Sequence, residues 1–140
     1  MALKEASDSV DRLVRLSAME NKLTLYSGND SQIFPTLSLG GMGVISVISN
    51  LIPKTVSTLC RDYFNGNKES ALKLQQDLLP FIRSMFIETN PSPIKYAMHL
   101  KELCSPDVRL PLALPRENSR AIIEEELKRL DDIIEKWAEK

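Results

Sequence analysis

A lysine near the start of the chain has the sequence context of a covalent catalyst. Lys4 follows the apolar residues Ala2 and Leu3, and the helix-capping residues Ser7-Asp8-Ser9 come shortly after it. We expect Lys4 to lie at the C-terminal end of a short buried strand, where loss of solvent favours the neutral, nucleophilic form of an amine. Because most lysines are exposed, the heptapeptide from Ala2 to Asp8 alone favours a surface lysine, and the rest of the sequence must decide.

Two further segments end in groups that suit a small anionic substrate. The strand-like run 23–27 stops at Gly28-Asn29-Asp30, and a β-branched run over 43–49 ends in Ser46 to Ser49. The C-terminal ends of parallel strands meet at one edge of a sheet. We therefore expect Lys4 to attack a substrate carbonyl while backbone amides of the other two segments hold a carboxylate.

Apolar periodicity predicts strands and helices in alternation over the first half of the chain. The expected order is a strand at 2–5, a helix from Val10, a strand at 23–27, a helix around 33–37, a strand at 43–49 buried on both faces, and a helix from Pro53. Gly40-Gly41 and Gly66 are expected to end the second and third helices. This pattern predicts an α/β fold with parallel strands, organised as βα units over residues 1–66.

The second half of the chain predicts helices only. A long helix follows Asn67, another begins at Pro93, and a proline-containing segment over 105–118 is expected to be extended. The last helix carries an apolar stripe from Ile122 to Trp137, which we expect to pack within the chain. We therefore place a boundary near Gly66, with a helical extension over 67–140.

Composition narrows the class of protein. With 18 basic and 19 acidic residues the chain has a net charge of −1, so we expect no nucleic-acid partner. The longest apolar run is far shorter than the roughly 18 residues that span a membrane, and no leader pattern opens the chain, which predicts a soluble cytoplasmic protein without a membrane contact. Cys60 and Cys104 are expected to be reduced, and His99, the single histidine, to be structural or solvated.

Five motifs in order and at matching spacing resemble the dihydrodipicolinate synthase family. They cover roughly residues 3–120 and are Lys4-Glu5-Ala6-Ser7 with Asp8, Leu25 to Asp30, Leu39 to Val47 with Asn50 and Pro53, Glu88 to Lys95, and Arg109-Leu110-Pro111-Leu112. Each motif alone is modest, and the five in register are specific.

The resemblance implies a fold and a reaction. The family is a (βα)8 TIM barrel with a C-terminal helical extension, and this chain matches its last three βα units and the extension. Lys4 is implied to form a Schiff base with pyruvate, Gly28 to lie in the substrate pocket, and the backbone of Ile45 to face the bound pyruvate. The second substrate is aspartate semialdehyde, on the pathway to diaminopimelate and lysine; no cofactor or metal is expected, and the full-length enzyme is expected to be a homo-oligomer.

Departures from the family pattern leave alternatives open. The usual Gly-Asp-Asp is Gly28-Asn29-Asp30 here, and the family's tyrosine pair, pocket threonine and carboxylate-binding arginine have no counterpart in the sequence. We therefore expect a fragment of a longer enzyme or a truncated reading frame, inactive by itself. The alternatives are a sialic-acid or sugar-acid aldolase of the same superfamily and a noncatalytic helical assembly module.

Overall fold

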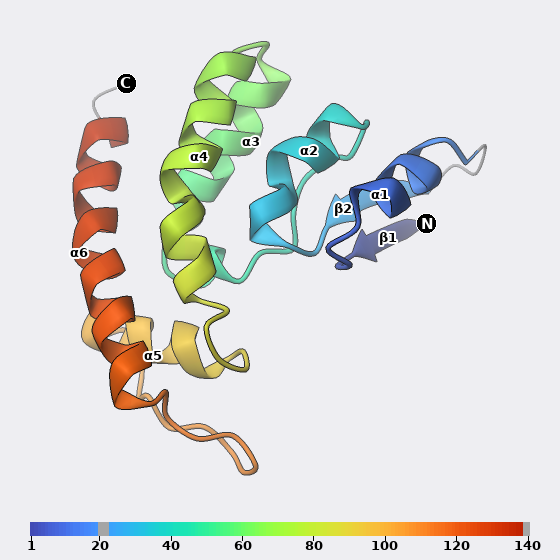
Figure 1. Ribbon diagram of the computed structural model, residues 1–140. Helices are drawn as coiled ribbons and strands as arrows, with labels where there is room; N and C mark the ends of the chain where they lie inside the picture. The colour runs from blue at the N-terminus through green and yellow to red at the C-terminus, as the bar shows by residue number, and fades with distance from the viewer. Residues whose placement is uncertain (20–22, 139–140) are drawn as a thin grey trace. The chain divides into compact units, whose positions relative to one another are not determined.

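In the computed structural model, which describes residues 1–19 and 23–138, two short parallel strands open the fold (Figure 1). Strand β1 (Ala2–Glu5) pairs with β2 (Thr24–Ser27) so that Lys4 lies opposite Tyr26. Helix α1 (Val10–Ser17) connects them, and its N-terminus is capped by Ser9, whose side chain accepts a hydrogen bond from the Arg12 amide. The expected first βα unit and second strand are confirmed.

The contacts divide the chain into two compact units. One consists of Met1–Val47 with Val56–Gln76, and the other of Ile48–Thr55 with Asp77–Lys140. The first nine residues of the long helix thus group with the strands. The expected division into a barrel part over 1–66 and an extension over 67–140 stays a prediction.

The core of the first unit lies between the strands and their helices. Besides β1, α1 and β2, the first unit contains the 3-10 turn η1 (Asp30–Gln32), helix α2 (Ile33–Ser38), most of α3 (Pro53–Phe64) and the start of α4 (Lys68–Ser84). Its buried apolar side chains are Leu13, Leu25, Ile33, Leu37, Val56, Leu59, Ala71 and Leu74. An apolar surface shared by strands and helices is what holds an α/β layer together.

Glycines end α2 and α3, as expected. After α2, Gly40 has a φ of +87°, and the amide of Gly41 donates to the Thr36 carbonyl at 2.8 Å. After α3, Gly66 has a φ of +88°, and the amide of Asn67 donates to the Asp62 carbonyl at 2.8 Å. Both ends are Schellman motifs, in which the left-handed position favours glycine.

The expected third strand over 43–49 is much shorter than the sequence pattern indicates. Only Val44 pairs, in a parallel bridge with Ser27, and residues Ile48–Asn50 form the 3-10 turn η2. The expectation of burial on both faces is wrong, since Ile45 is 50% exposed. Within the described residues this segment has β2 on one side and no strand on the other, so the ladder that would extend it is not formed.

The second unit is built on helices. It contains η2, the end of α4, α5 (Ser92–Leu100) and α6 (Glu117–Ala138). Helix α5 begins with Pro93 in its first turn, as expected, and α5 lies beside the N-terminal part of α6 in Figure 1. The Tyr96 hydroxyl joins the two helices by donating to the Glu124 carboxylate at 2.6 Å.

The apolar stripe of α6 packs within the chain, as the sequence predicts. Ile123, Leu127, Leu130 and Trp137 are buried, whereas Ile122 is 42% exposed. The Trp137 indole N–H also donates to the Asp77 carboxylate at 3.3 Å. Among the helices that the structure describes, none has the length and apolar content needed to cross a membrane.

Candidate active site

Lys4 lies in β1 and projects from the sheet into solvent. Strand alternation places Lys4 on one face and Glu5 on the other, and Lys4 is exposed while Glu5 is buried. The two side chains therefore lie on opposite faces, and Lys4 is exposed, as the heptapeptide alone favours, without the loss of solvent expected of a covalent catalyst. In the described residues β1 pairs with β2 alone.

Gly28 lies directly against the lysine. A Cβ atom on Gly28 would be 2.9 Å from the Cε atom of Lys4, 2.9 Å from the Glu5 carbonyl oxygen and 2.6 Å from the Cβ atom of Ala6. The Gly28 amide donates to the same Glu5 carbonyl at 2.6 Å. Because this space holds no side chain, glycine lets the end of β2 close on the end of β1, and the structure brings Lys4 and Gly28 together.

Ile45 lies one chain segment further on, across β2. Its amide donates to the Ser27 carbonyl at 2.8 Å, and the Ser27 amide donates to the Gly43 carbonyl at 2.9 Å. These bonds hold the backbone of Ile45 beside Ser27, which is the last residue of β2 and precedes Gly28. The three predicted site residues thus lie on adjacent segments of one unit, with Gly28 in contact with Lys4 and Ile45 bonded to the residue before Gly28.

Asn29 ties the ends of the two strands together. Its side-chain amide donates to the carbonyls of Ala6 and Ser7, each at 3.2 Å, and to the Asp8 carboxylate at 3.0 Å. An aspartate at this position has no N–H groups with which to make these bonds. The asparagine, where the resemblance implies an aspartate, therefore has a structural use here, because it holds the loop that follows Lys4.

A buried polar network supports the segment that carries Ile45. The Asp30 carboxylate is 1% exposed and accepts the Val47 amide at 2.9 Å. The side chain of Gln75 in α4 donates to the Asp30 carbonyl at 3.0 Å and accepts the Phe34 amide at 3.1 Å. Sequence reasoning missed Gln75; its polar character among the apolar positions of α4 is the signal that could have indicated it.

Glu5 forms a second buried network under the lysine-bearing strand. Its carboxylate accepts the Ser7 amide at 2.7 Å and forms an ion pair with the Arg12 guanidinium at 2.7 Å. Hydrogen bonding from Ser7, together with Arg12, outweighs burial and lowers the pKa of Glu5 to about 2. Glu5 is thus an ionised anchor between β1 and α1, a role that the sequence motif did not indicate.

Tyr26 lies beside Lys4 in the neighbouring strand. It is the direct cross-strand partner of Lys4, so the two side chains share a face of the sheet. Its ring also lies 3.5 Å from the position that a Cβ atom would take on Gly43. The pairing gives the lysine one phenol-bearing neighbour.

The single histidine and the two cysteines are outside this site. His99 is exposed at the end of α5, with its Nδ1 atom 3.3 Å from the Cys104 carbonyl oxygen. Cys60 and Cys104 are free thiols, and burial raises the pKa of the Cys60 thiol, which disfavours the reactive thiolate. In the part of the chain that the structure describes, no three His, Cys, Asp or Glu residues cluster as metal ligands would.

Comparison with known proteins identifies the family. The model of the dihydrodipicolinate synthetase family matches residues 1–130. The chain belongs to this family. It is 48% identical over 129 residues to 4-hydroxy-tetrahydrodipicolinate synthase of Clostridium novyi (strain NT), an alignment that covers 91% of this chain and 44% of that protein.

Solved structures of the family agree in fold. The 4-hydroxy-tetrahydrodipicolinate synthase of Methylacidiphilum fumariolicum SolV matches with a TM-score of 0.92 and 38% identity, over 97% of this chain and 46% of that one. The chloride-inhibited dihydrodipicolinate synthase of Acinetobacter baumannii, solved with pyruvate, matches with a TM-score of 0.84 and 32% identity, over 90% and 44% of the two chains. The chain thus spans less than half the length of these relatives and matches part of their α/β fold.

Proposed function

We propose that this chain supplies the Schiff-base lysine and part of the pyruvate pocket of a 4-hydroxy-tetrahydrodipicolinate synthase. The observation that carries the proposal is the packing of Lys4 against Gly28, at the end of a parallel strand pair. Reactive groups of βα barrels gather at the C-terminal ends of their strands. In this proposal the strands belong to a (βα)8 barrel, and the helices of the second unit to its C-terminal extension.

The chemical step assigned to Lys4 needs no cofactor. Its neutral amine attacks the keto carbon of pyruvate, and the resulting carbinolamine loses water to leave a protonated imine. The imine withdraws electrons from the adjacent methyl carbon, which loses a proton and then bonds to the aldehyde carbon of aspartate semialdehyde. Backbone groups around Gly28 and Ile45 are the proposed contacts of the pyruvate carboxylate and methyl end.

Condensation is proposed to need groups beyond those of this chain. The imine pathway requires an acid or base to move protons at the substrate. Tyr26 is the phenol beside Lys4, whereas the tyrosine pair, threonine and arginine that the resemblance implies have no counterpart in the sequence.

Borohydride trapping tests the assignment of the nucleophile. The chain is treated with pyruvate and sodium borohydride, and the reduced adduct is located by peptide mass spectrometry. We expect the adduct at Lys4 ahead of Lys54, an exposed lysine outside the strands, and loss of that adduct in Lys4→Arg. Equal labelling of both lysines would overturn the assignment.

A steady-state assay tests the need for further residues. We expect the 140-residue chain alone to show little or no condensation of pyruvate with aspartate semialdehyde. Robust turnover by this chain would contradict that expectation. Sugar acids serve as the comparison substrates, and cleavage of a sugar acid in preference to condensation would favour an aldolase of the same superfamily.

A further inference from the structure

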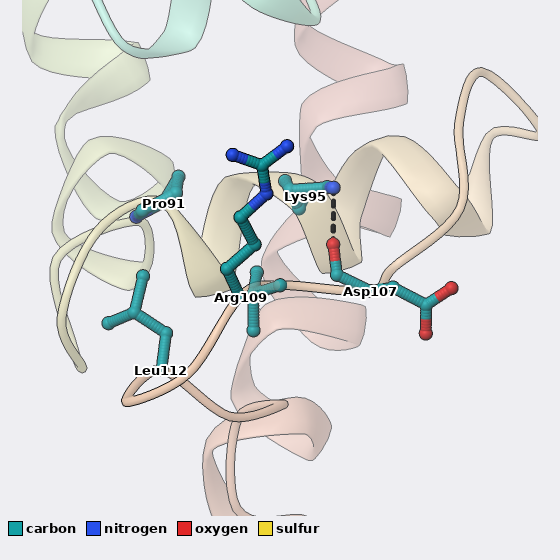
Figure 2. A pocket seen from close by; sticks show the side chains of 6 residues that line it. Pro91, Lys95, Asp107, Arg109 and Leu112 are labelled. Carbon is teal, nitrogen blue, oxygen red and sulfur yellow. Dashed lines mark hydrogen bonds between the residues drawn. The ribbon is translucent and has the colours of Figure 1, made fainter.

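The second unit has an open, mainly apolar pocket with two basic residues, Lys95 and Arg109, in its lining. It has a volume of about 490 Å³ and is lined by Pro91, Lys95, Asp107, Val108, Arg109 and Leu112 (Figure 2). Lys95 comes from α5, and Asp107 to Leu112 come from the segment between α5 and α6. The volume lies within the range of small-molecule sites, and none of these residues belongs to the lysine site described above.

The loop that carries Arg109 is held against α5 by specific bonds. The Lys95 amine donates to the backbone carbonyl of Asp107, and the Leu112 amide donates to the Arg109 carbonyl at 3.0 Å, which closes a turn. The Cys104 thiol donates to the Lys95 carbonyl at 3.9 Å and fixes the start of the loop. The pocket is therefore formed by a turn of defined shape.

Among the described residues, neither Lys95 nor Arg109 forms an ion pair with a carboxylate. The Asp107 carboxylate accepts a hydrogen bond from the Ser105 hydroxyl, and Figure 2 shows it pointing away from the Lys95 amine. Within residues 1–19 and 23–138, no carboxylate oxygen lies within 4.0 Å of a side-chain nitrogen of Lys95 or Arg109. Both cations therefore retain free hydrogen-bond donors, two on Lys95 and the five of the Arg109 guanidinium.

Two cations beside apolar side chains favour one class of ligand. An arginine fork binds a carboxylate through two parallel hydrogen bonds, and the lysine adds a point charge. Pro91, Val108 and Leu112 offer apolar surface that a bare inorganic anion would leave unused. We propose that this pocket binds a small organic acid whose carboxylate meets Arg109 and Lys95 and whose short branched apolar tail packs on Leu112 and its neighbours.

Titration with 3-methylbutanoate tests the site in the full chain. Amide chemical shifts report binding by residue, and we expect shifts at Lys95, Val108 and Leu112 with a Kd on the order of 1 mM, which suits so small a ligand. The neutral alcohol with the same apolar tail, 3-methylbutan-1-ol, and inorganic phosphate are each expected to bind at least about tenfold more weakly. Equal binding of phosphate would overturn the need for an apolar tail, and equal binding of the alcohol would overturn the role of charge.

Matched variants separate the pocket from general charge effects. Arg109→Met should weaken 3-methylbutanoate binding about tenfold or more, while Arg109→Lys, which keeps the charge and the exposed position, should weaken it less. Arg83→Met is the control, because Arg83 is an exposed arginine of α4 that does not line the pocket. Amide spectra without ligand show that each variant keeps its fold. The proposal is overturned if Arg109→Met and Arg83→Met bind alike, or if wild type shows no shifts at the pocket residues.

Discussion

The Cε atom of Lys4 lies 2.9 Å from the position that a Cβ atom would take on Gly28. This distance is shorter than a van der Waals contact, so any side chain on Gly28 must displace the lysine, the Glu5 carbonyl or Ala6. The glycine therefore leaves open the space beside which the Lys4 side chain lies. It makes the position of Lys4 dependent on the pairing of β1 with β2.

Gly28→Ala should both destabilise the chain and move the amine. Overpacking of this kind costs about 1–3 kcal/mol in the free energy of unfolding, measured by urea denaturation at fixed protein concentration. The rate at which an amine-selective reagent labels Lys4 should also change. Gly40→Ala is the control: its cost of about 1 kcal/mol comes from the left-handed backbone alone, and Lys4 labelling should stay unchanged. Wild-type stability and labelling in Gly28→Ala would contradict the packing argument.

Glu5→Gln should remove a pH-dependent part of the stability. The folded-state pKa of Glu5 is about 2, below its usual value of 4.5, so the ionised carboxylate stabilises the fold above about pH 4.5. That contribution is lost as the pH falls toward 2. As the pH falls from about 4.5 toward 2, the urea midpoint should fall less steeply for Glu5→Gln than for wild type. The exposed Glu125 provides the control, and Glu125→Gln should retain the wild-type slope.

Gln75→Leu tests the buried network that supports the Ile45 segment. The leucine fills similar space but leaves the Asp30 carbonyl and the Phe34 amide without their side-chain partner, which costs about 1–3 kcal/mol in the free energy of unfolding. Gln76→Leu, at the exposed neighbouring position of α4, should change it by less than about 0.5 kcal/mol. If the two variants were equally stable, the network would contribute nothing specific.

Adjacent isoleucines of α6 test whether its stripe packs within the chain. Ile123 is fully buried, so Ile123→Ala should create a cavity and cost about 2–5 kcal/mol in the free energy of unfolding. Ile122, at 42% exposed, should lose clearly less in Ile122→Ala. Chemical denaturation of the two variants at the same protein concentration makes the comparison. A larger loss for Ile122→Ala would indicate that α6 uses its other face, against a partner.

The sequence determined the elements whose signals are local. Ser7-Asp8-Ser9 predicts a helix start because these side chains can cap the first turn, and Gly40 and Gly66 predict helix ends because glycine accepts the left-handed backbone at low cost. The apolar stripe of α6 follows from helical spacing alone. The five motifs indicated the family, since their residue types and spacing are written in the chain itself.

Tertiary structure decided strand pairing, side-chain burial and long-range hydrogen bonds, because each of these depends on the neighbouring segments. The run 43–49 has the composition of a strand buried between two others, but among the described residues it has β2 on one side only, and only Val44 pairs. Lys4 is exposed for a related reason, because burial is a property of the surrounding segments. The contacts of Gln75 with Asp30 and Phe34 bridge more than 40 positions along the sequence, and folding alone brings these groups together.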